Sequence, residues 1–156
     1  MDVKPSATGF ALPNPQDLIA TNVICRRFIK ASLIYFLVSA ILGTLMATRL
    51  VPVQFFPHAH LNLIGWVSMM IFGVAYKMLP TMFAAKQVVH SLSLARLHFW
   101  LANVGLIGMS VTFVCKDYCP VTWAGPLLLG IFALVELAGS AVFFYNIWMT
   151  FKVQQS

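Results

Sequence analysis

The sequence has 156 residues, of which 60% are hydrophobic and only 9% carry a charge. A soluble domain needs more polar surface than this, so the composition excludes one and favours a protein that lies in a lipid bilayer. The formal net charge of +6 is explained by cations near the expected membrane surfaces. No basic run with interleaved aromatic residues indicates a nucleic-acid partner.

The chain is expected to begin with a surface tail over residues 1–22, which contains several prolines. Residues 23–156 predict one all-α domain of four transmembrane helices. Each span is long enough to cross the hydrocarbon and must be helical, because unpaired backbone groups are costly in lipid. The approximate spans are 28–47, 58–79, 94–114 and 121–151.

The connections between spans are short, which predicts an up-down antiparallel order. Most cations fall on one side of this arrangement: Arg26, Arg27, Lys30, Lys77, Lys86, Arg96 and Lys152. Only Arg49 and Lys116 fall on the other side. Because cytoplasmic connections are rich in Lys and Arg, we expect both termini in the cytoplasm and the chain in the inner (cytoplasmic) membrane.

The second span carries the strongest chemical signal, the pair His58 and His60. Pro57 predicts that the helix begins at His58, and Pro80 is expected to close it. Side chains two residues apart on a regular helix point about 200° apart, so the pair does not readily chelate one ion. The two imidazoles can instead serve two sites on opposite faces. In the alternative interpretation, both lie at the headgroup level and bind nothing.

Other polar and small residues extend this pattern. Asn62, Gly65 and Met69 share the face of His58, and Gly65 leaves room for either a neighbouring helix or a flat ligand. We expect a structural or interfacial role for His98 and a solvated position for His90. Glu136, at membrane depth in the fourth span, is either a proton relay or a protonated hydrogen-bond partner.

Cys115 and Cys119 lie at the outer end of the third span, on the side of His58 and His60. Thiolates and imidazoles together suit copper, so these four side chains are a candidate copper site. A disulfide in an oxidising compartment, or two unpaired thiols, are the alternatives.

Three motifs resemble the catalytic subunit (subunit I) of haem-copper oxidases and nitric oxide reductases. The stretch from His58 through Gly73 to Pro80 resembles the tenth helix of that subunit. Leu97-His98-Phe99-Trp100-Leu101 with Gly105 resembles the start of the eleventh, and Phe143-Phe144-Tyr145-Asn146-Ile147-Trp148 the end of the twelfth. The chain therefore resembles the last four helices of this family.

The resemblance implies that His58 and His60 are axial ligands of two different haems, expected to be haem b, and that His98 is not a ligand. The family's copper ligands and active-site tyrosine lie on helices with no counterpart among these four spans, so an oxidoreductase-related role is implied without a complete haem-copper site in one chain. The family's twelve helices form three arcs about a pseudo-threefold axis, which favours a homo-oligomer and specifically a homotrimer. In it, His58 of one subunit and His60 of the next would share a haem.

The predicted function is thus a membrane haem b protein that transfers electrons, with a respiratory electron donor as partner, or binds a diatomic gas such as O2 or NO. The alternative is a copper-binding protein, or an assembly or structural subunit of a respiratory complex.

Overall fold

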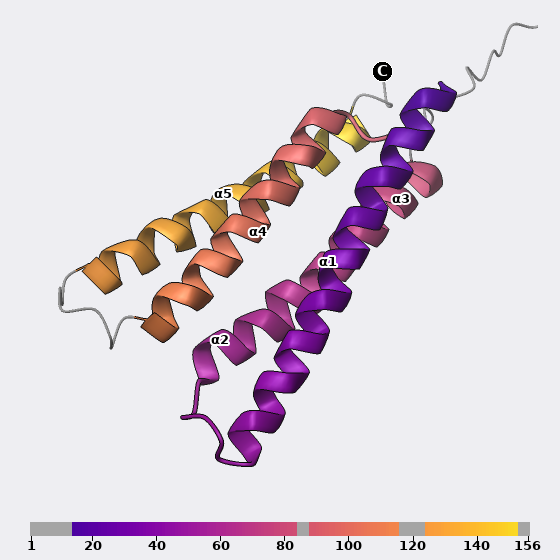
Figure 1. Cartoon of the computed structure of the whole chain (residues 1–156). Coiled ribbons are helices and arrows are strands. Elements are labelled where there is room, and N and C mark those ends of the chain that lie inside the picture. The colour runs from indigo at the N-terminus through magenta and orange to yellow at the C-terminus, as the bar shows by residue number, and fades with distance from the viewer. Residues whose placement is uncertain (1–13, 84–87, 116–123, 153–156) are drawn as a thin grey trace, which may run out of the picture.

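The computed structural model describes residues 14–83, 88–115 and 124–152. Within these ranges the protein is all-helical, with four helices long and apolar enough to cross a membrane (Figure 1). The first is α1 (Pro15–Ala47), and the second span joins α2 (Phe55–His60), η1 (Leu61–Ser68) and α3 (Met69–Phe83). α4 (Leu92–Cys115) and α5 (Ala124–Lys152) follow. The prediction of a multi-pass, four-helix membrane protein is confirmed.

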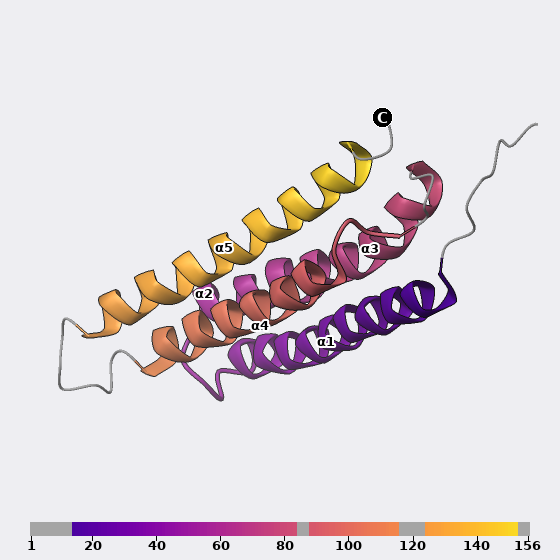
Figure 2. The ribbon, with the colours of Figure 1, turned by 90° about the horizontal axis from the view of Figure 1, so that it is seen from above.

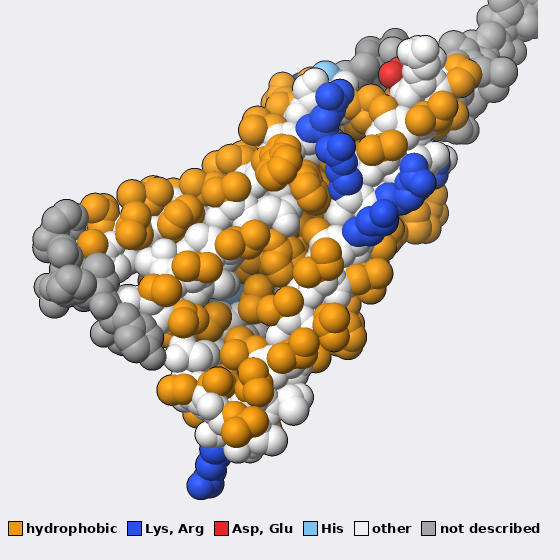
Figure 3. All heavy atoms as spheres, in the orientation of Figure 1, with side chains coloured by type: hydrophobic (Ala, Val, Ile, Leu, Met, Phe, Trp, Pro, Cys, Tyr) orange, Lys and Arg blue, Asp and Glu red, His pale blue; other side chains and the backbone are white. Residues whose placement is uncertain are grey.

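The surface agrees with a lipid environment. Figure 3 shows a face covered mainly by hydrophobic side chains, with most of its Lys and Arg side chains toward one end of the molecule. Such a surface would be unusual on a soluble monomer, which rarely exposes large contiguous apolar patches.

The first helix begins earlier than the sequence predicted. The Asn14 side chain caps it by accepting a hydrogen bond of 3.0 Å from the Gln16 N–H, and Pro15 occupies the first helical position. Residues 15–22, expected in the surface tail, are therefore helical, whereas residues 1–13 lie outside the described part of the chain. With 33 residues, α1 is about 50 Å long and exceeds the roughly 30 Å of hydrocarbon.

The second span also differs from prediction at both ends. It begins at Phe55, so Pro57 is its third residue rather than the residue before it. Proline is tolerated there because the first four N–H groups of a helix have no intrahelical partner. At the other end the helix continues through Pro80 to Phe83.

The middle of this span, Leu61–Ser68, is a π-helix of eight residues, which the sequence did not predict. The Ser68 hydroxyl donates to the Leu63 carbonyl, five residues earlier, at 2.8 Å. π segments inside α-helices are rare and are frequent at functional sites. This one begins immediately after His60.

Close packing depends on glycines that face neighbouring helices. α4 and α5 lie side by side (Figures 1 and 2), and a Cβ at Gly105 would lie 2.8 Å from the Glu136 backbone nitrogen. α1 lies along the second span, and a Cβ at Gly73 would lie 3.1 Å from the Cys25 carbonyl oxygen. Small residues let membrane helices approach this closely, which increases the dispersion contacts between them.

All four spans meet around His98, whose side chain is fully buried. Its ring centroid lies 4.9 Å from that of Phe28, 4.6 Å from that of Phe72 and 5.3 Å from that of Phe143. The Tyr76 hydroxyl is hydrogen-bonded to the His98 Nδ1 at 3.0 Å. This position fits the structural role expected for His98.

The connection before α4 is held to α5 by hydrogen bonds. The Asn146 side chain accepts a hydrogen bond from the Ser91 N–H and donates one to the Ser91 carbonyl, both at 2.9 Å. The His90 N–H donates to the Thr150 hydroxyl at 2.9 Å, while the His90 side chain is exposed, as expected. These bonds fix the start of α4 relative to the end of α5.

Candidate functional site

His58 faces α1. Its Nδ1 lies 3.2 Å from the Ser39 hydroxyl, which donates to the His58 carbonyl at 3.3 Å. A Cβ at Gly43 would lie 2.9 Å from the His58 Cε1, so the ring occupies space that this glycine leaves open. Because the Ser39 hydroxyl donates its one hydrogen to the His58 carbonyl, its oxygen can only accept a hydrogen bond from Nδ1. The imidazole proton is therefore placed on Nδ1. The Asn62 amide then donates to Nε2 at 3.3 Å.

His60 is held on the other side of the helix. Its Nδ1 bonds to the Phe56 carbonyl at 2.8 Å, and since a carbonyl only accepts, Nδ1 carries the proton. The ring stacks on the Phe56 ring at 3.9 Å, and Phe56 stacks on Phe113 of α4 at 4.6 Å. Among the described residues, none donates a hydrogen bond to the His60 Nε2. His58 and His60 thus contact different neighbours, one on α1 and one toward α4.

Ser39 and Gly43 are the residues that sequence reasoning missed. They lie four residues apart on α1 and therefore on one helical face, which is a weak signal for a small polar groove. Nothing in the sequence assigns that groove to His58, because the pairing of α1 with the second span is a tertiary contact.

Gly65 and Met69 lie inside the helix packing. A Cβ at Gly65 would lie 2.7 Å from the Tyr35 Cγ and 3.0 Å from the Leu106 Cδ2. Met69 is fully buried. Of the two uses predicted for Gly65, the close approach of a neighbouring helix is the one these contacts support.

An apolar cavity of about 370 Å³ lies beside the histidines, between α1, the start of the second span and α4. Neither His58 nor His60 lines it. Its lining includes Tyr35, Pro57, Leu61, Ser110 and Cys115.

The histidines fit a haem in their donor chemistry. A metal-binding imidazole usually donates its other ring N–H to a carbonyl or hydroxyl oxygen, which fixes the ring and leaves a lone pair on Nε2. His60 meets this description directly, and His58 meets it once the Asn62 amide turns away. Neither histidine lines the cavity beside them.

The copper alternative gains no support from the geometry. Cys115 is an exposed free thiol at the end of α4, and Cys119 lies outside the described residues. No group of three or more His, Cys, Asp or Glu side chains that could hold a metal occurs within residues 14–83, 88–115 and 124–152.

Glu136 is buried where α5 meets Gly105 of α4. Its Oε2 atom has no hydrogen-bond partner among the described residues. The hydrogen bond to a neighbouring helix that was one of its two predicted roles is therefore not made by this oxygen within the described part of the chain.

No family model matches the sequence. Curated relatives do match it. The sequence is 33% identical over 87 residues to the cbb3-type cytochrome c oxidase subunit CcoN1 of Stutzerimonas stutzeri, which covers 52% of this chain and 18% of that protein. It is 27% identical over 121 residues to a cytochrome c oxidase subunit 1 homolog of Bradyrhizobium diazoefficiens, covering 64% of this chain and 22% of that protein. It is 25% identical over 119 residues to cytochrome c oxidase subunit 1 of Rhodobacter capsulatus, covering 62% and 22%.

The resemblance to subunit I of haem-copper oxidases is therefore confirmed over about half to two thirds of the chain. The chain spans only about a fifth of the length of these relatives. It is a haem-copper oxidase-like membrane protein, related to a family whose cofactors are haem and copper.

Proposed function

We propose that this chain is a membrane haem b protein in which His58 and His60 bind the iron of two different haems, one on each face of the second span. The observation that carries the proposal is the bond from the His60 Nδ1 to the Phe56 carbonyl, which leaves Nε2 as a free ligand atom. When bound, haem would supply one-electron redox chemistry or a site for O2 or NO. Two histidine ligands favour electron transfer, whereas an open axial position favours gas binding.

The chain's own residues would position the two rings. Ser39 accepts the Nδ1 hydrogen of His58 and so sets its orientation. The Phe56 carbonyl does the same for His60, while the stacked Phe56 and Phe113 rings cover one side of that imidazole. Such supporting contacts commonly change metal affinity by about 10-fold to 100-fold when removed.

The cavity beside the histidines is lined by neither of them among the described residues, which is consistent with haem sites completed by a second chain. We therefore propose a homo-oligomer, with a homotrimer favoured by the pseudo-threefold plan of the family. The mass of the detergent-solubilised complex tests this: a monomer that retains full haem content would contradict it.

The proposed placement is the inner (cytoplasmic) membrane, in up-down order, with both termini cytoplasmic and a respiratory electron donor as partner. The contacts support the order: Lys77 donates to the Asn22 side chain at 2.7 Å, and Ser39 pairs with His58. Thus an early part of α1 meets a late part of the second span, and the reverse. Exposed Arg26, Arg27 and Arg96 would face the cytoplasm.

The decisive experiment is a reduced-minus-oxidised visible spectrum of the purified protein and of single variants. His58→Ala and His60→Ala should each lower the haem content per chain. His90→Ala is the matched control, because His90 is exposed in the connection before α4. This variant should retain its full haem content. Absence of a Soret band, or unchanged haem in both ligand variants, would refute the proposal.

Two other functions give different results in the same preparation. A copper protein would lose its metal in Cys115→Ser with Cys119→Ser, whereas haem binding should survive those changes. A structural subunit of a respiratory complex would be colourless and stable only with its partner.

A further inference from the structure

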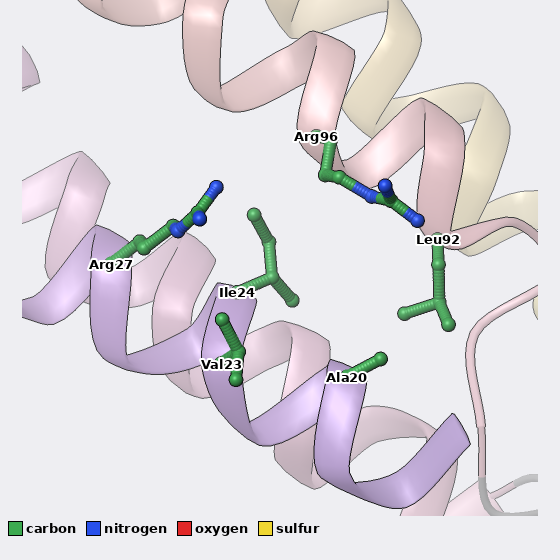
Figure 4. A pocket seen from close by; sticks show the side chains of 6 residues that line it. All are labelled: Ala20, Val23, Ile24, Arg27, Leu92 and Arg96. Atoms are coloured by element: carbon green, nitrogen blue, oxygen red, sulfur yellow. The ribbon is translucent and has the colours of Figure 1, made fainter. Parts of the chain in front are cut away.

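A second candidate site lies between the start of α4 and α1, away from the histidines. A cleft of about 270 Å³ opens there, and its lining comes from two helices (Figure 4). Four of its residues are apolar and two are arginines: Ala20, Val23, Ile24, Leu92, Arg27 and Arg96.

The two arginines have no counter-charge among the residues that the structure describes. Arg27 comes from α1 and Arg96 from α4, and both side chains border the same cleft (Figure 4). In the part of the chain that the structure describes, neither guanidinium forms an ion pair or a side-chain hydrogen bond, and no acidic residue lines the cleft. Two like charges on one cleft repel each other unless an anion lies between them.

Helix lengths place both arginines at the edge of the hydrocarbon. About 20 residues, Phe28 to Ala47, suffice for α1 to cross, so Arg27 is the last residue before that stretch. α4 has 24 residues, and Arg96 lies about 6 Å along it from Leu92, leaving about 28 Å beyond it. Both guanidinium groups therefore lie at the depth of lipid headgroups.

We propose that this cleft binds the phosphate group of an anionic phospholipid. Guanidinium groups form strong, often bidentate hydrogen bonds with phosphate oxygens. The acyl chains of a lipid held there would extend into the hydrocarbon beside the stretch Phe28 to Ala47, an attachment that a free phosphate ion does not have. The lipid would bridge α1 and α4 on the cation-rich side of the membrane.

The test measures lipid binding to the full-length protein in detergent by native mass spectrometry. The probes are phosphatidylglycerol, phosphatidylcholine and inorganic phosphate. Phosphatidylglycerol should bind more tightly than phosphatidylcholine, and Arg27→Gln with Arg96→Gln should weaken it roughly tenfold or more. Arg27→Lys with Arg96→Lys should give an intermediate loss, because lysine keeps the charge but lacks the fork.

The matched control is Arg26→Gln with Lys30→Gln, which removes the same charge from exposed residues that do not line the cleft. This variant should retain most of the preference for phosphatidylglycerol. Equal losses in the two glutamine variants would overturn the site. Equal binding of both lipids, or binding of inorganic phosphate that excludes phosphatidylglycerol, would overturn the lipid assignment.

Discussion

Replacing Gly105 by alanine tests the packing that places α4 on α5. The new Cβ would lie 2.8 Å from both the backbone nitrogen and the Oε2 of Glu136, and 2.9 Å from its Cα. Backbone atoms cannot rotate away, so the two helices must separate. Overpacking costs about 1–3 kcal/mol, and a rigid obstacle places the cost near the upper end of that range.

Alanine also favours the helix over glycine by about 1 kcal/mol, which offsets part of this cost. The net change for Gly105→Ala is therefore a loss of about 2 kcal/mol in the free energy of unfolding. Gly130→Ala is the matched control, because a Cβ at Gly130 on α5 meets no atom within 4 Å. That variant should gain about 1 kcal/mol from the helix propensity of alanine, with no packing cost.

Thermal unfolding in detergent, followed by circular dichroism, measures the difference between the two variants. A difference of about 3 kcal/mol corresponds to roughly 6–12 °C in Tm for a chain of this size. Equal Tm values for Gly105→Ala and Gly130→Ala would show that α4 and α5 do not pack as closely as described.

Two further predictions concern other parts of the chain. Asn146→Ala leaves the Ser91 N–H and carbonyl without their partner, so the Tm should fall by an amount equivalent to about 1–3 kcal/mol. Thr81→Ala, at an exposed residue, should change the Tm little. Equal Tm values for the two variants would show that these hydrogen bonds do not hold the connection to α5. In a background with Cys25→Ser and Cys119→Ser, a membrane-impermeant maleimide added from outside should label the exposed Cys115. Labelling only after the inner face is opened would reverse the proposed topology.

The number and approximate position of the spans were predictable because length and hydrophobicity alone determine them. Their ends were not. Pro57 and Pro80 predict helix boundaries, but proline is tolerated in the first turn of a helix, and the second span continues past Pro80. The prolines suggested an irregular segment as far as residue 22. The helix instead begins eight residues earlier, after the polar cap Asn14.

The candidate site was predictable only within one helix. Periodicity placed Asn62 on the face of His58, and the two side chains are hydrogen-bonded. Contacts between helices could not be predicted from periodicity, because the partners of His58 on α1 are 19 and 15 residues away in sequence. Likewise, the space at Gly65 could not be assigned to Tyr35 or to a ligand until α1 was placed.

The π-helix after His60 makes the second span sensitive to its length. A π segment fits extra chain into a stretch that an α-helix would cross with fewer residues. The His58 ring contacts α1 at Gly43, and Gly73 contacts α1 at Cys25. Both contacts are made against one continuous helix, and η1 lies between them. Converting this stretch to α geometry without removing a residue would rotate one of these contacts away from α1. The number of residues between the histidines and α3 is thus constrained, even where the side chains of η1 face lipid.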